Sequence, residues 1–280
     1  MNKTKIDWAD STWNPVTGCL HGCVYCYAKG IARRFAGFEP RCGGEVIPDG
    51  EGTSPGSIHN TTHGQKLHVF DKQPMRRLNA RGYPNGKFMA TNYPYGFEPT
   101  LHRHKLDEYK HMKGRTIFVC SMADLFGEWV PVEWIKEVFD ACAAAPQHRY
   151  LFLTKNPERY TELFQKDILP DGADATNYWF GTTAVNEQVP FWFSSHHYTF
   201  VSIEPILGPF EAIDNPVAKV NWVIIGTETK NGKIINPPKR EWIENIVKNC
   251  RATDTSVFMK ESLRGIMGDD FIQEFPWEVK

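Results

Sequence analysis

Three cysteines lie within eight residues near the start of the chain, at Cys19, Cys23 and Cys26. Their spacing is C-x3-C-x2-C, and Tyr27 and Ala28 follow at once. Three thiolates at this spacing can each bind one iron of a [4Fe–4S] cluster, which leaves the fourth iron without a protein ligand. Because an iron with an open position can bind a small molecule, this segment predicts a cluster that takes a ligand.

Two other chemistries use closely spaced cysteines. Structural zinc normally has four ligands in two pairs, and the chain has no second C-x2-C pair. His21 lies inside the loop and could be a fourth ligand, although a residue between two ligands rarely reaches the same metal. Disulfides are disfavoured, because three is an odd number and nothing marks the chain as secreted. The cluster is therefore the preferred interpretation and zinc is the alternative.

The composition is that of an ordinary soluble globular protein. Of 280 residues, 41% are hydrophobic and 23% are charged, and the length suits one domain with an insertion. No apolar run approaches the ~18 residues that a membrane span needs, and the polar first segment lacks the apolar stretch of a signal peptide. We therefore expect a cytoplasmic protein with no membrane association.

Charge is distributed unevenly along the chain. Residues 59–115 contain eleven Lys or Arg and four Asp or Glu, a net of +7, whereas the whole chain carries −1. Such a segment is typical of a surface that binds DNA or RNA, and equally of a solvated, irregular insertion. Arg76, Arg77 and Arg81 are spaced so that a short helix would place them on one side.

Beyond residue 100 short β-rich runs alternate with helical segments, a pattern that indicates βα units and a parallel sheet. The predicted strands are Thr116–Cys120, Arg149–Leu153, Tyr178–Thr182, Tyr198–Ile203, Trp222–Ile225 and Ser256–Met259. The predicted helices are His104–His111, Val130–Ala144, Pro157–Gln165, Glu187–Ser194 and Arg240–Cys250. With a strand before Cys19, about six βα repeats are expected. The predicted fold is α/β, a partial or full (β/α) barrel in one domain over residues 1–280, with an irregular basic insertion at about residues 37–100.

Polar residues follow the predicted strands repeatedly. The runs are Cys120–Asp124, Leu153–Pro157, Gly181–Thr183, Ser202–Pro205, Gly226–Glu228 and Met259–Glu261. Working residues of parallel α/β folds lie at these carboxyl ends, so six runs at one rim predict the lining of a pocket.

Some of these residues have simpler structural explanations. Thr154 and Asn156 are expected to cap the helix at Pro157, and a lone Lys155 is usually solvated. Glu204 is as readily a solvated or ion-paired carboxylate as a functional one. Cys120 is a candidate hydrogen donor to a substrate radical, although a small buried thiol on a strand is the commoner case.

The chain also resembles a known group. It is similar to a phage- and mobile-element-associated three-Cys family of the radical S-adenosylmethionine superfamily, whose reaction is not established. The matching runs are TWNPVTGC, GCVYCYA, FVCSMADLF, LTKNPERY, FGTTAVNE, VSIEPILGP, WVIIGTE and VFMKE, within residues 6–36 and about 98–262. More distantly, the LTKN run and the strand order are similar to the spore photoproduct lyase group, which repairs DNA.

The resemblance implies cofactors and roles. A barrel of the radical S-adenosylmethionine type would use a [4Fe–4S] cluster on Cys19, Cys23 and Cys26 to cleave S-adenosylmethionine to a 5′-deoxyadenosyl radical, with a flavodoxin- or ferredoxin-type reductant. The implied cofactor-binding residues are Tyr25 beside the adenine, Ser121 or Asp124 at the methionyl ammonium, Lys155 at the carboxylate, and Thr182 and Thr183 at the ribose, with Glu204 as a further candidate. Ser121–Asp124 lacks the glycines of the Gly-Gly-Glu run found there in the superfamily.

Three functions are compatible with these observations. The first is radical chemistry on a nucleic-acid base, as modification or repair. The second is the same chemistry on a small metabolite or a peptide. The third is a non-catalytic, metal-stabilised binding protein, which the row of polar strand ends disfavours because a structural rim has no need of Lys155 and Glu204 together.

Overall fold

The chain forms two compact units. The computed structural model describes residue 4 and residues 6–36, 46–47, 59–60, 66–77, 88–210, 219–230 and 232–278. Unit 1 consists of Met1–Thr12, Gly114–Phe118 and His148–Lys280, and unit 2 of Trp13–Lys113 and Val119–Gln147. The chain passes between the units several times, so neither is a continuous stretch. The prediction of one domain with an insertion stays a prediction.

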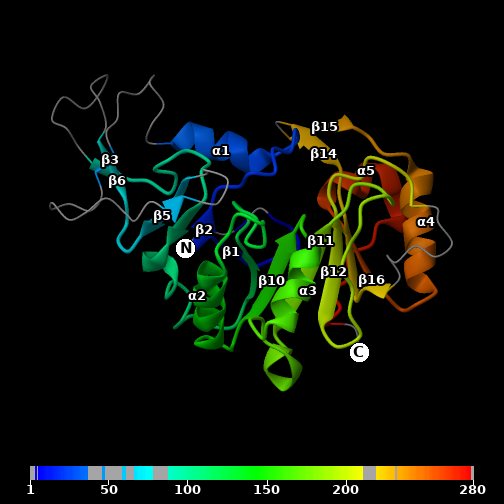
Figure 1. The fold of residues 1–280 in the computed structure, drawn as a ribbon. Coiled ribbons are helices and arrows are strands. Elements are labelled where there is room, and N and C mark those ends of the chain that lie inside the picture. Colours follow the sequence, from blue (N-terminus) through cyan, green and yellow to red (C-terminus); the bar gives the residue numbers. More distant parts are fainter. Residues whose placement is uncertain are drawn as a thin grey trace. The chain divides into compact units, whose positions relative to one another are not determined.

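Unit 1 is built around a parallel sheet (Figure 1). In spatial order its strands are β1 (Ser11–Trp13), β9 (Thr116–Val119), β10 (Arg149–Thr154), β11 (Tyr178–Thr183), β12 (Tyr198–Ile203), β13 (Trp222–Ile225) and β16 (Ser256–Met259). Every neighbouring pair from β9 to β16 is parallel. The order leaves β1 and β16 as edges among the described strands. The α/β prediction is confirmed, and the open order corresponds to a partial barrel.

Two of the predicted helices of unit 1 are present, one after β10 and one before β16. The described helices of unit 1 are α3 (Glu158–Gln165), α4 (Arg240–Arg251) and the short α5 (Arg264–Met267), with 3-10 turns at η2 (Gly172–Ala175), η4 (Glu261–Leu263) and η5 (Gly268–Asp270). A two-stranded hairpin, β14 (Glu228–Lys230) and β15 (Lys233–Asn236), follows β13. Among the helices that the structure describes, none is both long and apolar enough to cross a membrane.

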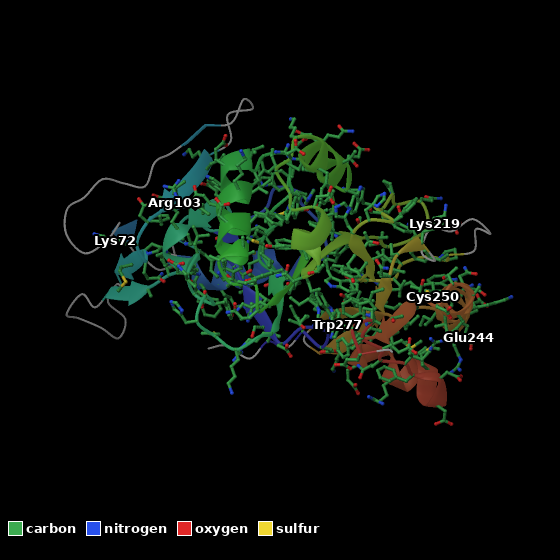
Figure 2. The ribbon with its side chains drawn as sticks, turned by 90° about the horizontal axis from the view of Figure 1, so that it is seen from below. Lys72, Arg103, Lys219, Glu244, Cys250 and Trp277 are labelled. Atoms are coloured by element: carbon green, nitrogen blue, oxygen red, sulfur yellow. The ribbon has the colours of Figure 1, made fainter. Side chains whose placement is uncertain are left out.

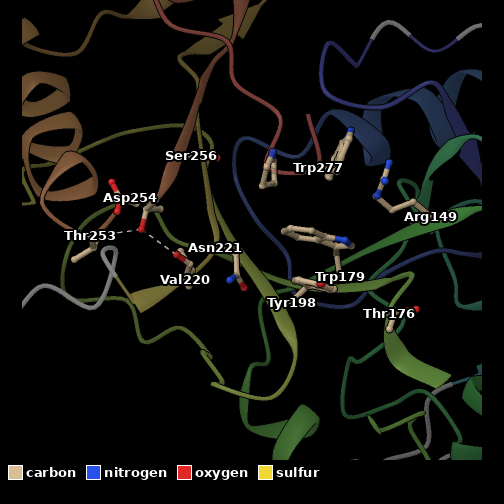
Figure 3. A pocket seen from close by; sticks show the side chains of 12 residues that line it. Arg149, Thr176, Trp179, Tyr198, Val220, Asn221, Thr253, Asp254, Ser256 and Trp277 are labelled. Atoms are coloured by element: carbon tan, nitrogen blue, oxygen red, sulfur yellow. Dashed lines mark hydrogen bonds between the residues drawn. The ribbon is translucent and has the colours of Figure 1, made fainter. Parts of the chain in front are cut away.

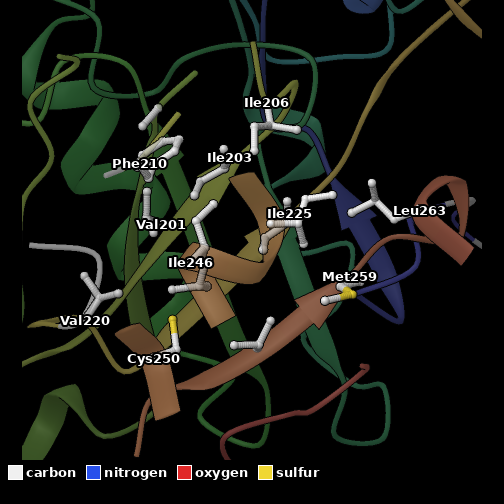
Figure 4. Packing of buried hydrophobic residues seen from close by; sticks show 14 of the residues in the cluster. Val201, Ile203, Ile206, Phe210, Val220, Ile225, Ile246, Cys250, Met259 and Leu263 are labelled. Atoms are coloured by element: carbon white, nitrogen blue, oxygen red, sulfur yellow. The ribbon is translucent and has the colours of Figure 1, made fainter. Parts of the chain in front are cut away.

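Alternate residues of the parallel strands enter two cores. In β13, Val223 and Ile225 pack with Ile243 and Ile246 of α4, as Figure 4 shows for the surrounding cluster. Trp222 and Ile224 enter the other core, which is rich in aromatic side chains. All four residues of this strand are buried, as expected for a parallel strand covered on both faces.

The helix α4 has one buried side and one exposed side. Cys250 has no exposed surface, whereas the Glu244 side chain is 51% exposed, and Figure 2 labels both. The predicted helix is therefore amphipathic, with its apolar stripe on the sheet.

Unit 2 has smaller sheets and, among its described residues, two α-helices. Its helices are α1 (Tyr27–Phe35) and α2 (Val132–Ala143), with a 3-10 turn at η1 (Arg103–Lys105). One sheet has the order β2 (Val16–Thr17), β8 (Thr100–His102), β5 (Lys66–Phe70) and β4 (His59–Asn60), and the other β3 (Val46–Ile47), β6 (Met75–Arg77) and β7 (Phe88–Ala90). Pairing in the second sheet is antiparallel.

Three local predictions are wrong. The segment predicted as helix His104–His111 is instead η1 followed by turns. In these turns a backbone amide donates to the carbonyl three residues earlier, as the Glu108 amide does to the Lys105 carbonyl. The Lys105 carbonyl also accepts the Trp13 indole N–H at 2.8 Å. Arg76 and Arg77 lie in the strand β6 rather than in a short helix, and Arg81 lies outside the described residues.

The predicted helix Glu187–Ser194 is also absent from the described chain, where this segment is irregular. Pro190 lies within it and has no backbone N–H for a helical bond. The Trp192 amide instead donates to Thr182 Oγ1 at 3.2 Å. A contact from another strand therefore overrides the local helical pattern.

Candidate functional site

The cysteine segment lies in unit 2 and leads directly into α1. Cys19, Cys23 and Cys26 are free thiols, and each is partly exposed. Cys26 is the N-cap of α1, and its Sγ accepts a hydrogen bond from the Lys29 amide at 3.4 Å. The third cysteine of the motif is thus tied to the first turn of the helix.

The donor chemistry of this segment fits an iron–sulfur cluster. Three sulfur ligands on one loop are the set that such a cluster uses. Among the described residues, no three His, Cys, Asp or Glu side chains are grouped closely enough to hold a metal ion as they stand. Binding therefore requires the thiols to draw together. Val24 at the loop tip is 100% exposed, so packing around it does not oppose this movement.

The environment of Cys19 opposes its deprotonation. Burial raises the pKa of the Cys19 thiol to about 12, and the negative charges of Asp124, Cys23 and Cys26 add to the rise, while a bond from the His21 amide opposes it. Deprotonating Cys19 thus needs a compensating cation, and a bound metal would supply that charge.

The loop is held by the segment that follows β9. The Gly18 amide donates to the Met122 carbonyl at 2.9 Å, and Gly18 forms a parallel bridge with Ala123. Asn14 Oδ1 accepts from Ser121 Oγ at 3.1 Å and from the Met122 amide at 2.9 Å. These bonds join two parts of unit 2 that are far apart in sequence.

Gly18 is required at its position by two independent constraints. Its φ is +87°, a left-handed conformation that side chains rarely adopt. A Cβ there would lie 2.2 Å from the backbone oxygen of Glu98. The residue just before the first cysteine therefore fixes the approach of the loop to its support.

A histidine inside the loop makes a second attachment, which we call the His21–Asp124 latch. His21 Nε2 and Asp124 Oδ2 are 2.7 Å apart, and Asp124 Oδ1 accepts from the Phe126 amide at 3.0 Å. The His21 ring also meets the Trp129 ring in an edge-on contact at 4.8 Å. The imidazole that sequence reasoning weighed as a zinc ligand is thus hydrogen-bonded to a carboxylate.

The remaining predicted residues of unit 2 surround the same segment. Ser121 bonds Asn14 through its hydroxyl and Tyr27 through its carbonyl, at 3.1 and 2.7 Å. Asp124 is 5% exposed, and Tyr25 is partly buried. Roles of Ser121, Asp124 and Tyr25 toward S-adenosylmethionine stay predictions.

Cys120 is a buried thiol directly after β9. It is 3% exposed and has a φ of +58°, and its amide donates to the Trp13 carbonyl at 2.7 Å. Burial raises the pKa of this thiol to about 12, so it is protonated at neutral pH. A protonated thiol is the form that can give up a hydrogen atom, and the catalytic role of Cys120 stays a prediction.

In unit 1, the predicted residues lie at the carboxyl ends of β10, β11 and β12. Lys155 follows β10 and is partly buried. Thr182 is fully buried and Thr183 is 8% exposed. The N-cap residue of α3 is Pro157, so neither Thr154 nor Asn156 is itself the N-cap residue. Thr154 Oγ1 instead accepts from the Asn156 amide at 2.9 Å.

Glu204 is the centre of a polar cluster at the strand ends of unit 1. Its Oε1 is 2.7 Å from Lys260 Nζ, and its Oε2 accepts from Ser202 Oγ at 2.9 Å and from Trp8 Nε1 at 3.3 Å. The charge of Glu204 raises the pKa of Lys260 against the effect of burial. The ion-paired interpretation of Glu204 is confirmed.

The partners of Glu204 were not identified from the sequence. Ser202 and Lys260 do lie in the polar runs at strand ends, so their position was the available signal. Trp8 gave no such signal in the sequence, because it precedes the first strand. A Cβ on Gly226 would lie 2.8 Å from Lys260 Cδ and 2.9 Å from Glu204 Oε1, so any other residue there would displace one of these two side chains.

A cavity of about 400 Å³ lies at the other ends of the strands in unit 1 (Figure 3). Its lining includes Trp179, Tyr198, Asn221, Ser256 and Trp277, which lie at or near the beginnings of their strands or in the carboxyl-terminal segment. No predicted site residue lines it.

Comparison with known proteins identifies the family of the chain. A family model described as "Protein of unknown function (DUF5131)" matches residues 3–265. No curated protein and no solved structure matches the chain. Because the match covers nearly all of the 280 residues, the chain belongs to the DUF5131 family.

Proposed function

We propose that this protein is a radical S-adenosylmethionine enzyme in which Cys19, Cys23 and Cys26 hold a [4Fe–4S] cluster. The observation that carries the proposal is a loop with three free thiols, fixed by hydrogen bonds to the segment after β9. When bound, such a cluster supplies one electron that splits S-adenosylmethionine into methionine and a 5′-deoxyadenosyl radical.

The protein contributes the position of the ligands. Gly18 brings the loop against Glu98 and Met122, and the His21–Asp124 latch holds its middle. His21 Nε2 is bonded to Asp124, so Nδ1 is the ring nitrogen of this imidazole that could still bind a metal. A cluster held by the three thiolates alone would keep its fourth iron open for the amino and carboxylate groups of S-adenosylmethionine.

The substrate is the less defined part of the proposal. The basic segment favours a nucleic-acid base, but several of its described cations are already paired. Arg103 donates to both oxygens of Glu137, at 2.7 and 2.8 Å, and to Asp71 at 3.3 Å, and Lys105 donates to Asn92 at 2.8 Å. These pairs reduce the charge available to phosphates, so a small metabolite or peptide remains the second candidate.

The proposal is tested by anaerobic reconstitution with iron and sulfide. The unaltered chain should turn brown, and with dithionite and S-adenosylmethionine it should release 5′-deoxyadenosine. Changing Cys19, Cys23 or Cys26 to Ala should abolish both properties, whereas Cys142→Ala, at a buried thiol in α2, should preserve them. A colourless protein that binds zinc would instead support a non-catalytic binding function. Oligonucleotides, nucleosides and peptides can then be compared as substrates.

A further inference from the structure

The beginnings of the strands in unit 1 surround the cavity of about 400 Å³ shown in Figure 3. Arg149, Tyr198 and Ser256 are the first residues of β10, β12 and β16, and Trp277 comes from the segment after η5. Every residue that lines the cavity belongs to unit 1, whereas the cysteine loop belongs to unit 2. The cavity is therefore a separate feature from the proposed cluster ligands.

One wall of the cavity is aromatic. Trp179 and Tyr198 are register partners on neighbouring strands, and their rings stack with centroids 4.7 Å apart and planes 10° apart. Trp277 meets the Trp179 ring edge-on at 5.4 Å. Trp179 belongs to the buried aromatic core, whereas Tyr198 is 43% exposed. Aromatic faces of this kind are suited to contact with a planar ring.

A guanidinium without an ion pair lies beside this wall. The Arg149 Cζ lies 4.0 Å from the centroid of the Trp277 ring. Among the described residues its side chain donates one hydrogen bond, from Nη1 to Thr116 Oγ1 at 3.1 Å. Burial lowers the pKa of Arg149, and the charges of Asp10 and Glu278 oppose that effect only in part. Because a partly buried charge costs free energy unless it is paired, this arginine points to a ligand that carries negative charge.

Other lining residues have hydrogen-bonding groups to spare. Asn221 Oδ1 accepts from the Thr199 amide at 2.8 Å, which leaves the amide Nδ2 without a partner among the described residues. Asp254 is exposed and, in the same part of the chain, forms no ion pair, and Figure 3 shows it across the pocket from Arg149. Ser256 is 7% exposed and adds a hydroxyl. An amide donor and a carboxylate acceptor are groups that pair with the edges of nucleobases.

We propose that this cavity binds a free nucleoside monophosphate, with the base against Trp179 and Tyr198 and the phosphate at Arg149. The base supplies the planar ring and the hydrogen-bonding edge, and the phosphate supplies the charge that the guanidinium lacks among the described residues. Arginine can donate two parallel hydrogen bonds to a phosphate. Cavities for small molecules hold about 300–1,000 Å³, so this one suits a single nucleotide. Binding here needs neither the cluster nor S-adenosylmethionine.

Binding is measured by isothermal titration calorimetry with the full unloaded chain. AMP, GMP, CMP and UMP are titrated separately, and at least one of them should bind with a Kd below about 1 mM. The tightest of the four is then compared with its own nucleoside, which lacks the phosphate. We expect the nucleotide to bind about tenfold to a hundredfold more tightly, because it alone makes the charge-assisted contact with Arg149.

The Arg149→Gln variant tests that contact directly. It should weaken the nucleotide by about tenfold or more and leave the nucleoside almost unchanged, so that the ratio of the two affinities approaches one. An arginine with a merely structural role would lower both affinities alike and keep the ratio. Arg264→Gln is the matched control, because Arg264 also lies over an aromatic ring, that of Phe271 at 4.1 Å, and does not line the cavity. Both affinities should stay unchanged in this control.

Two further variants test the site of the base. Tyr198→Ala should weaken nucleotide and nucleoside alike, by about fivefold or more. Phe193→Ala, at an aromatic side chain that is 45% exposed and does not line the cavity, should change neither. Asn221→Asp keeps an oxygen to accept from Thr199 but removes the amide donor, so it should weaken both ligands while urea unfolding changes little.

The results that would overturn nucleotide binding are specific. One is that none of the four nucleotides binds below about 1 mM. A second is that Arg149→Gln keeps the ratio of nucleotide to nucleoside affinity. A third is that tryptophan or indole-3-acetate binds more tightly than every nucleotide, which would make the site one for aromatic acids. A 5′-phosphorylated trinucleotide should bind more weakly than the mononucleotide, and stronger binding would assign the site to the end of a strand instead.

The outcome is distinguishable from that of the proposed function. The Cys19→Ala variant should form no cluster, yet it should bind the nucleotide as the unaltered chain does, because Cys19 belongs to unit 2 and the lining residues to unit 1. Failure to release 5′-deoxyadenosine would refute the radical chemistry and leave the calorimetric result standing. Loss of nucleotide binding in Cys19→Ala would contradict a site that is independent of the cysteines.

Discussion

Two glycines in the cysteine loop provide a sharp test of how the loop is held. Gly18 and Gly22 both have positive φ, +87° and +69°. A Cβ on Gly18 would lie 2.2 Å from the Glu98 oxygen, whereas a Cβ on Gly22 would meet nothing within 4 Å. Gly18→Ala and Gly22→Ala therefore share the conformational cost and differ in the clash.

The expected difference follows from these contacts. Alanine in a left-handed conformation costs roughly 1–2 kcal/mol, which is the whole cost at Gly22. At Gly18 the backbone must also move by about an ångström, which disrupts the Gly18–Met122 and Cys19–Phe97 bonds. Each lost bond costs about 0.5–1.5 kcal/mol. We expect Gly18→Ala to lose roughly 2–5 kcal/mol of unfolding free energy, by the same two costs.

The assay combines urea unfolding with iron content after reconstitution. Gly18→Ala should lose most of its iron, because the first ligand is no longer positioned, whereas Gly22→Ala should retain it. Equal destabilisation and equal iron content in the two variants would refute the role given to the Gly18 contact. Iron loss in both would mean that any change of the loop backbone is sufficient.

Further predictions concern cofactor binding, the latch, the strand-end cluster and acid stability. Lys155→Ala should weaken S-adenosylmethionine binding tenfold to a hundredfold, about 1.5–3 kcal/mol, with iron content unchanged, and unaltered binding would remove Lys155 from the site. Asp124→Ala should weaken S-adenosylmethionine binding and also lower the iron content, because the change removes the hydrogen-bond partner of His21. Full iron loading of this variant would contradict the role given to the His21–Asp124 latch. Glu204→Gln leaves Lys260 without its charge partner and should cost about 1–3 kcal/mol in urea unfolding, at the lower end because both side chains keep some solvent contact. Burial holds the pKa of His102 well below its usual value, so below about pH 6.5 the unfolded chain takes up a proton that the folded chain does not. The free energy of unfolding should therefore fall by up to about 1.4 kcal/mol for each pH unit below that value. The His102→Gln variant should show a smaller dependence of unfolding free energy on pH.

The elements predicted best are those that their own residues determine. The runs at β11, β12, β13 and β16 are short, apolar and rich in β-formers, and they are strands at the predicted positions. The helix Arg240–Cys250 ends one residue later than predicted. A parallel sheet follows from such alternation without knowledge of individual contacts.

The two wrongly predicted helices, His104–His111 and Glu187–Ser194, are explained by contacts with residues far away in the sequence or on another element. Trp13 bonds the Lys105 carbonyl and Thr182 bonds the Trp192 amide, and neither partner is visible in a local pattern. The same limit applies to the site. The spacing of the cysteines predicts a metal ligand set, but the latch joins residues 103 positions apart, and no sequence period connects them.

The sulfur at the start of α1 has a consequence for damage by oxygen. Cys26 Sγ accepts the Lys29 amide, so one atom serves both as helix cap and as metal ligand in the proposed enzyme. Oxidation of this thiol to a sulfinic or sulfonic acid is irreversible for most proteins, and it would replace the capping sulfur by bulkier oxygen atoms. Oxidative loss of the metal would then also loosen the first turn of α1. Faster hydrogen exchange of the Lys29 amide would report this loss without a measurement of colour or turnover.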